Sequence, residues 1–270
     1  MRLSLAAAVM LAASPALAGA TGWQDLGAGA RARLIASDRL GSDGKTFIAI
    51  ELDMPAGTKT YWRVPGETGI ATELDLSNST GVGGERIVWP YPTIDQQGGY
   101  TDFVYYGPVV IPVELDVGAE RPRVEASLLL GICSDICIPA MAAFALPLDF
   151  SQPDAGQELR IAQALALAPT AWDGPGEAIR RARFDTRAQR LDVLLGSPAV
   201  DPASVIADAS QSGHVFGAPQ KSPEAGIVSL PLIGGDGADL DGVAVQFVFM
   251  TQDGPFEVTR RVEASTGGAS

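Results

Sequence analysis

Short apolar-rich segments separated by turn-forming residues dominate residues 31–150. Residues 46–52 (TFIAIEL) form one such segment, which a Pro-Ala-Gly turn follows. Residues 59–64 (KTYWRV) carry the aromatic and branched side chains that suit a half-buried pleated surface. Further candidate strands are 32–36, 85–89, 109–115, 124–130 and 142–150. Many short strands with frequent turns predict a β-sandwich, because a parallel sheet would need helices between its strands.

One helix is predicted, over residues 156–168, and Pro169 ends it. The apolar residues that fall on one face of it at helical spacing are Leu159, Ala162, Leu165 and Ala166. A proline- and glycine-rich stretch follows, so residues 151–176 are predicted to connect two domains.

A second, smaller β domain is predicted over residues 177–263. Its candidate strands are 178–184, 190–195, 226–232, 243–251 and 256–262. Residues 264–270 are predicted to be a disordered tail, because their composition is poor in apolar residues. The sequence therefore predicts an all-β protein of two domains, with a short helix between them.

The first eighteen residues have the pattern of an export signal. Arg2 supplies a positive start, residues 3–13 form a short apolar run, and Ala16-Leu17-Ala18 is the small-x-small pattern that signal peptidase recognises. A bilayer span needs about 20 apolar residues, and this run is shorter. We therefore expect cleavage after Ala18 and release of the mature chain into the oxidising periplasm. Its first domain would then span residues 19–150.

Composition narrows the classes of partner. The 270 residues are 46% hydrophobic, which is enough to bury a sizeable core, and their net charge is −13. The phosphates of nucleic acids and of anionic membrane surfaces would be repelled by that charge, so we expect neither as a partner. The apolar segments after residue 18 are only as long as strands, so we expect no membrane insertion. A single histidine makes a multi-histidine metal centre impossible, and no motif points to a cofactor.

Cys133 and Cys137 are the one chemically potent pair in the sequence. Gly131 and Pro139 bracket them, which suits the end of a hairpin, and a tight turn would bring the two residues within disulfide range. A disulfide here is either an inert staple or a redox site. A loop this small constrains little of the unfolded chain, and strain in a tight loop makes a bond easier to reduce. Spacing alone leaves both possibilities open.

The charges near the pair bear on its redox direction. No Lys, Arg or His lies within eight residues of either cysteine, and Asp135 lies between them. A nearby carboxylate disfavours a thiolate, so neither thiol is expected to be unusually acidic. Such a dithiol is expected to act as a reductant rather than as an oxidant.

Aromatic residues are dense in the segment before the cysteines, and most are expected to pack in the core. Residues 90–100 (PYPTIDQQGGY) are the best candidate for a mobile cover over the sulfurs. Their glycines give the segment freedom, and their aromatic rings give it bulk.

Four ordered segments resemble the periplasmic amino-terminal domain of DsbD-type disulfide reductases, particularly the ScsB-like branch. They are residues 57–69 (GTKTYWRVPGETG), 88–92 (VWPYP), 106–114 (YGPVVIPVE) and 131–139 (GICSDICIP). The resemblance covers about residues 30–150.

The resemblance implies an immunoglobulin-like β-sandwich whose cysteine pair takes electrons from a membrane-embedded transporter and reduces disulfides of envelope proteins. By this resemblance Cys133 and Cys137 are the redox pair. The residues that would line the site or its cap are Tyr61, Trp62, Tyr91, Asp95 and Tyr100. DsbD proteins usually continue into a membrane domain and a thioredoxin domain, which are missing here, so the transporter is expected to be a separate membrane protein.

Two alternatives stay open. A Cys-x-x-x-Cys pair with a later histidine also resembles the copper site of Sco-type chaperones, which would use Cys133, Cys137 and His214, with Met141 nearby. Sco cysteines begin a thioredoxin-fold helix, whereas residues 142–150 alternate like a strand, and His214 is expected at the surface. The other alternative is a structural β scaffold with an inert disulfide.

Overall fold

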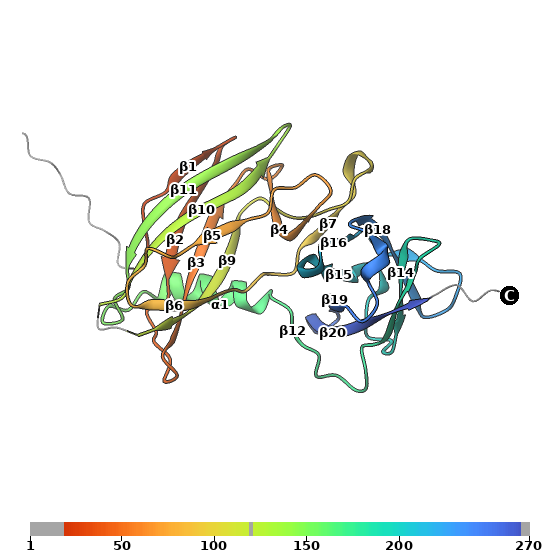
Figure 1. The fold of residues 1–270 in the computed structure, drawn as a ribbon. Helices are drawn as coiled ribbons and strands as arrows, with labels where there is room; N and C mark the ends of the chain where they lie inside the picture. The colour runs from red at the N-terminus through yellow and green to blue at the C-terminus, as the bar shows by residue number, and fades with distance from the viewer. Residues whose placement is uncertain (1–18, 119–120, 266–270) are drawn as a thin grey trace, which may run out of the picture.

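The computed structural model describes residues 19–118 and 121–265, and its strands form two β domains (Figure 1). The predicted export signal, residues 1–18, lies outside the described residues. The strands of the first domain are β1 Gln24–Gly27, β2 Ala30–Ala36, β3 Lys45–Asp53, β4 Lys59–Gly66, β5 Glu73–Asp75, β6 Val82–Ile87, β7 Thr93–Asp95, β8 Asp102–Tyr106, β9 Val109–Val117, β10 Arg123–Cys133 and β11 Cys137–Pro147.

These strands form two sheets that face one another. One sheet has the order β1-β2-β3-β9-β6, and the other has the order β11-β10-β4-β8-β7, with β5 paired to β10. Alternate side chains of each strand point inward, so Leu34 and Val113 of one sheet meet Trp62 and Leu130 of the other in a single core. The predicted immunoglobulin-like sandwich is confirmed.

Helix α1 (Ala155–Ala166) packs against the outer side of the first sheet, where Ile161 joins Ile35 and Ala49. The Asp154 side chain caps the helix by accepting a hydrogen bond from the Gln157 backbone N–H. Among the described residues no helix is both long and apolar enough to cross a bilayer.

The predicted apolar face of this helix was wrong at three of its four positions. Leu165 is partly buried against the sheet, but Leu159, Ala162 and Ala166 are exposed, whereas Gln157, Ile161 and Ala164 are buried. Two of the predicted positions were alanines, which bury too little apolar area to orient a helix against a sheet.

The second domain is a closed barrel. Its strands are β12 Thr170–Ala171, β13 Ile179–Asp185, β14 Arg190–Leu195, β15 Ile206–Ala209, β16 His214–Phe216, β17 Gln220–Lys221, β18 Ile227–Gly234, β19 Ala244–Thr251 and β20 Gly254–Ser265. The order β20-β13-β14-β18-β16-β15-β19 closes because β19 also pairs with β20. Closure leaves this part of the sheet without free edges.

Several predicted element ends differ from the structure. β11 begins at Cys137 rather than at residue 142, and β6 begins at Val82 rather than at residue 85. β20 continues to Ser265, which pairs with Asp185, so residues 264–265 are not part of a tail. Residues 266–270 lie outside the described part of the chain. In each case pairing with a neighbouring strand outweighs local composition.

The two domains are joined by an ion pair between β4 and the barrel. Arg63 Nε donates to Asp208 Oδ2 over 2.5 Å, and Arg63 Nη2 donates to Gln246 Oε1 over 2.9 Å. The guanidinium also stacks on the Trp62 ring, 4.3 Å from its centroid. Because both partners of the ion pair are largely shielded from water, their mutual attraction is screened less than that of an ordinary surface pair.

Apolar side chains of the barrel complete the contact. Ile206 of β15 and Val248 of β19 are fully buried and belong to the core of the sandwich. The Tyr91 hydroxyl donates a hydrogen bond to the Ser204 carbonyl oxygen across the same boundary. The two domains therefore share buried apolar surface as well as an ion pair.

A double-mutant cycle tests the strength of the ion pair. We expect Arg63→Gln and Asp208→Asn to couple by about 1–2 kcal/mol in the free energy of unfolding, because each leaves a shielded partner unpaired. Urea unfolding of the two single variants and the double variant measures this coupling. The matched control is the pair Arg31–Asp53, whose side chains are 51% and 42% exposed and should couple by about 0.5 kcal/mol or less. Equal coupling in the two cycles would contradict the shielding argument.

Candidate functional site

The two cysteines lie at the turn of the β10–β11 hairpin. Cys133 ends β10 and Cys137 begins β11, directly opposite in register, with their Cα atoms 4.0 Å apart and their sulfurs joined in a disulfide. Cys133 is 1% exposed, whereas Cys137 is exposed to solvent. Cys137 is therefore the sulfur that an approaching group meets first.

The phenol of Tyr61 contacts both sulfurs. Its hydroxyl oxygen lies 2.8 Å from Cys133 Sγ and 3.2 Å from Cys137 Sγ. Tyr61 reaches them because β4 pairs with β10 at Lys59 and Cys133, and side chains two residues apart on a strand share a face. Burial raises the pKa of the Tyr61 phenol, so the hydroxyl keeps its proton and can donate a hydrogen bond to sulfur.

Two glycines make room for the Tyr61 ring. A Cβ atom at Gly131 would lie 3.0 Å from two ring carbons, and one at Gly69 would lie 2.3 Å from Tyr61 Cδ1. Any other residue at Gly69 would collide with the ring or displace it from the sulfurs. The position of the phenol thus depends on glycine in the 131–139 segment and in the 57–69 segment.

Buried charges surround Lys59, the backbone partner of Cys133. Lys59 Nζ donates to Asp95 Oδ2 over 2.7 Å and to Asp102 Oδ2 over 3.3 Å, and both carboxylates are 5% exposed. Burial lowers the pKa of Lys59. The hydrogen bonds with the two carboxylates raise it by more than burial lowers it, so the pKa lies above its ordinary value. The ammonium is therefore charged at neutral pH.

Hydroxyl groups complete this charge cluster. Thr68 Oγ1 donates to Asp102 Oδ2 over 2.6 Å, and the Tyr106 hydroxyl donates to Asp95 Oδ2 over 2.8 Å. Two carboxylates face one ammonium, so the cluster carries one net negative charge beside the disulfide.

The structure corrects the expectation that no cation lies near the cysteines. The statement holds along the chain, but β4 brings Lys59 directly opposite Cys133. The two carboxylates that hold Lys59 exceed its charge, so the cluster as a whole does not favour a thiolate. A thiol of ordinary acidity stays the prediction.

Only some of the residues predicted to line the site lie near the sulfurs. Tyr61 contacts the sulfurs, and Asp95 belongs to the charge cluster. Trp62 is fully buried in the core behind the sheet, where its ring meets Phe103, so it does not line the site. Neighbouring residues on a strand point to opposite faces, which separates Trp62 from Tyr61.

The predicted cover, residues 90–100, is a loop that hydrogen-bonds to β4. It contains β7 and a short 3-10 helix, Gln97–Gly99, and the Asp95 side chain anchors it to β4 through Lys59. Tyr100 follows that helix and is exposed at the surface. Tyr91 lies at the boundary with the second domain rather than at the sulfurs.

Sequence reasoning missed Lys59, Thr68 and Asp102 as site residues. Lys59 and Thr68 stand in the 57–69 segment, so their place in the chain was noticed, but only strand pairing reveals that they meet a carboxylate of β8.

The structure also corrects the expectation for His214. It is buried on β16, and its ring nitrogens lie 2.9 Å from Ser212 Oγ and 2.6 Å from the Asp236 carbonyl oxygen. Within the described residues no group of three His, Cys, Asp or Glu side chains is arranged to hold a metal. The copper hypothesis thereby loses its third ligand, because both nitrogens of His214 already have partners in the barrel.

Asp95→Asn tests the charge cluster through its pH dependence. Burial raises the pKa of Asp95, but the hydrogen bonds from Lys59 and Tyr106 outweigh burial and bring the pKa below its ordinary value. A carboxyl whose pKa is lower in the folded than in the unfolded protein stabilises the fold at pH values above its unfolded-state pKa of 3.8. That stabilisation is lost as the pH falls through the folded-state pKa. We expect the variant to lower the free energy of unfolding by about 2 kcal/mol at pH 7 and by less at about pH 3.

Urea unfolding at the two pH values measures this difference. Asp253→Asn, an exposed carboxyl in a turn of the barrel, is the control and should change little at either pH. A loss that is equal at both pH values would show that Asp95 contributes through packing rather than charge.

Comparisons with known proteins agree with this geometry. The family model described as "Thiol:disulfide interchange protein DsbD, N-terminal" matches residues 31–149, which include both cysteines. Among solved structures, the N-terminal periplasmic domain of ScsB from Proteus mirabilis is similar over 92% of this chain and 100% of that chain, with 27% identity and a TM-score of 0.71. A search of the curated proteins finds no match. Residues 31–149 therefore match a DsbD-type amino-terminal domain, and the chain as a whole is similar to the ScsB domain.

Proposed function

We propose that this protein is a periplasmic thiol:disulfide oxidoreductase that passes electrons from a separate membrane transporter to disulfides of envelope proteins. The observation that carries the proposal is the asymmetry of the disulfide, with Cys137 exposed and Cys133 buried beneath the Tyr61 phenol. A purely structural disulfide needs neither an exposed cysteine nor a hydrogen-bond donor beside the buried one. The similarity to a periplasmic ScsB domain supports the compartment.

The first half of the proposed exchange begins at Cys137. A donor thiolate attacks Cys137 Sγ, because Cys137 is the exposed residue of the pair, and forms a mixed disulfide. The bond between Cys137 and Cys133 breaks, and its electron pair leaves on Cys133 Sγ. The Tyr61 hydroxyl, 2.8 Å away, donates a hydrogen bond to the new thiolate and so stabilises the leaving group.

A second donor thiolate then attacks the donor sulfur of the mixed disulfide and releases Cys137. The donor is now a disulfide, and the protein has gained two electrons and, on protonation, two protons. In the second half the Cys137 thiolate attacks a disulfide of an envelope protein. Cys133 resolves that mixed disulfide, which leaves the envelope protein as a dithiol and restores the Cys133–Cys137 bond.

The charges around the pair support this direction of electron flow. The two carboxylates outnumber the one ammonium, so the reduced pair gains no net electrostatic stabilisation as a thiolate. A dithiol whose thiolate is not stabilised gives up electrons more readily, which is the behaviour of a reductant.

Trapping with single-cysteine variants tests the function. Cys133→Ala keeps the exposed sulfur and lacks the resolving one, so we expect it to accumulate disulfide-linked envelope proteins at Cys137. Cys137→Ala keeps only the buried sulfur and should capture much less. Non-reducing electrophoresis with mass spectrometry of the adducts measures both, and the double variant is the control.

Two results together would overturn the function. One is that neither single variant captures a protein. The other is that the native bond resists a thiol buffer poised near ~−300 mV, which is the behaviour of a structural disulfide.

Tyr61→Phe tests the role of the phenol. We expect the rate constant for reduction of the native disulfide by dithiothreitol to fall about tenfold, because the leaving thiolate loses one hydrogen bond from a neutral donor. Tyr106→Phe is the matched control, since its hydroxyl contacts Asp95 and neither sulfur. An unchanged rate in a folded Tyr61→Phe variant would remove Tyr61 from the mechanism.

A further inference from the structure

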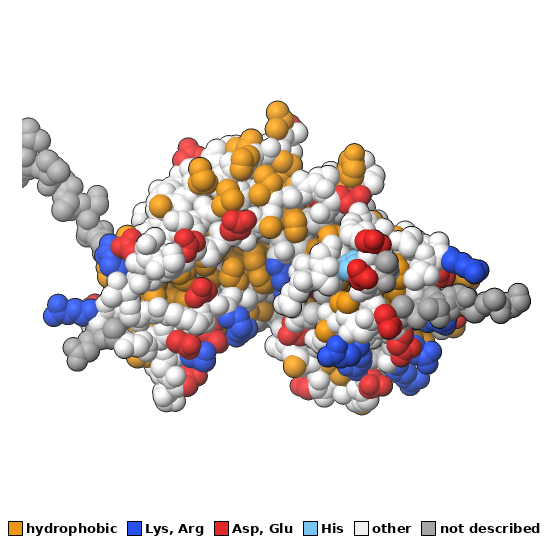
Figure 2. Space-filling view, viewed as in Figure 1, with side chains coloured by type: hydrophobic (Ala, Val, Ile, Leu, Met, Phe, Trp, Pro, Cys, Tyr) orange, Lys and Arg blue, Asp and Glu red, His pale blue; other side chains and the backbone are white. Residues whose placement is uncertain are grey.

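The outer face of β11 carries Cys137 at one end and continues away from it without a charged side chain. Cys137, Pro139, Met141 and Ala143 alternate onto this face of β11, and all of them are exposed. Met141 is 79% exposed, which is unusual for a large apolar side chain. Figure 2 shows hydrophobic side chains gathered over this hairpin. A surface of this kind is typical of a binding site.

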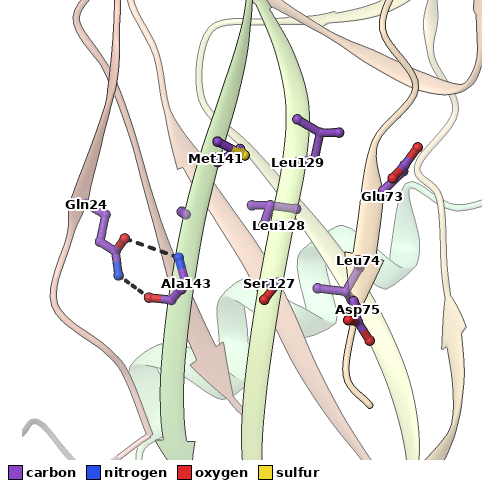
Figure 3. A pocket seen from close by; sticks show the side chains of 10 residues that line it. Gln24, Glu73, Leu74, Asp75, Ser127, Leu128, Leu129, Met141 and Ala143 are labelled. Carbon is purple, nitrogen blue, oxygen red and sulfur yellow. Dashed lines mark hydrogen bonds between the residues drawn. The ribbon is translucent and has the colours of Figure 1, made fainter. Parts of the chain in front are cut away.

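Strand register arranges this face in rows. Met141 lies opposite Leu129, which lies opposite Glu73 of β5. The next row consists of Ala143, Ser127 and Asp75. The small side chains of this second row leave a shallow hollow of about 610 Å³ below the two larger apolar ones (Figure 3).

Two carboxylates form one wall of the hollow. Glu73 and Asp75 are exposed, and within the described part of the chain neither forms an ion pair with Lys or Arg. The backbone and side chain of Ser77 hydrogen-bond Asp75 and lower its pKa, so this carboxyl stays ionised. Glu125, further along β10, is by contrast paired with Arg123 over 2.5 Å. The hollow thus offers apolar contact beside two negative charges that have no cation.

Gln24 forms the opposite wall of the hollow and covers the edge of β11 there. The Gln24 side-chain amide hydrogen-bonds both the N–H and the C=O of Ala143 and so occupies the free edge of β11 at this point (Figure 3). A partner strand cannot extend the sheet where that edge is already bonded. The face of the sheet, rather than its edge, is open.

We propose that this hollow is a docking site for the protein partner whose sulfur reacts at Cys137, a proposal that rests on the function above. The occupant is a segment of that partner with an apolar side chain and a basic side chain. A strand rises about 3.4 Å per residue, so these side chains contact Met141 and Asp75 roughly 14 and 20 Å from the reacting sulfurs. They therefore lie about four and six residues from the partner's reactive cysteine in an extended segment.

Charge favours this occupant over a second copy of the same chain. The chain carries a net charge of −13, so a second copy would bring further negative charge to the two carboxylates. A basic side chain from a different protein neutralises them instead.

Synthetic peptides test the docking site on the full chain. Each peptide has one cysteine, a leucine four residues away and either lysine or glutamate six residues away, with both chain directions represented. The measurement is the rate at which each peptide thiol reduces the native disulfide at low salt. We expect the lysine peptide to react about fivefold faster than the glutamate peptide, and the ratio to fall towards one at high salt.

Variants locate the effect. Glu73→Gln with Asp75→Asn should bring the lysine-to-glutamate ratio to about one, and Met141→Ser should slow both peptides without changing the ratio. Glu85→Gln, an exposed carboxylate of the other sheet, is the matched control and should leave the ratio unchanged.

Dithiothreitol separates this proposal from the function on which it rests. If dithiothreitol reduces the bond but the native chain shows a peptide ratio of one, the docking site is overturned and the exchange function stands. If neither dithiothreitol nor any peptide reduces the bond, the exchange function itself fails. A native chain that sediments as a dimer, and a Glu73→Gln/Asp75→Asn variant that does not, would assign the hollow to a second copy and overturn the proposed occupant.

Discussion

The register between β10 and β11 is the constraint on which the rest of the site depends. Eleven consecutive residue pairs, from Arg123–Pro147 to Cys133–Cys137, hold the two strands in one alignment. A slip of one residue would send every side chain of one strand to the opposite face and separate the sulfurs. The same alignment places the exposed side chains of β11 on the same face of the sheet as Cys137. The hairpin thus determines both where the disulfide forms and what surface surrounds it.

The environment of the disulfide combines a closely packed phenol with a charge cluster in which two carboxylates outnumber one ammonium. The Tyr61 ring packs closely against Gly69 and Gly131, and a Cβ atom at Gly69 would overlap it, so these glycines help to set the position of the hydroxyl. Lys59 brings a positive charge to the same face, and Asp95 and Asp102 neutralise it. Because the surrounding charge is not positive, the Tyr61 hydroxyl can donate a hydrogen bond to a leaving sulfur without making the thiol strongly acidic.

The fold was largely predictable from the sequence, because strand alternation and turn residues are local signals. The hairpin position of the cysteines was also predictable, since Gly131 and Pro139 bracket them. The partners of Lys59 were not, because Asp102 is 43 residues away and meets it only through the pairing of β4 with β8. Trp62 was assigned to the site together with Tyr61, although adjacent strand residues face opposite ways. His214 seemed exposed in a turn-rich stretch, yet barrel closure buries it.

One strand connects the sulfur chemistry to the barrel. β4 pairs with the end of β10 through Lys59, sets the phenol against the disulfide through Tyr61 and grips the second domain through Arg63 (Figure 1). These three side chains stand on five consecutive residues, so one short segment links the charge cluster, the phenol and the barrel. A substitution that weakens the Arg63 contact with the barrel therefore acts on the strand that positions the phenol beside the sulfurs.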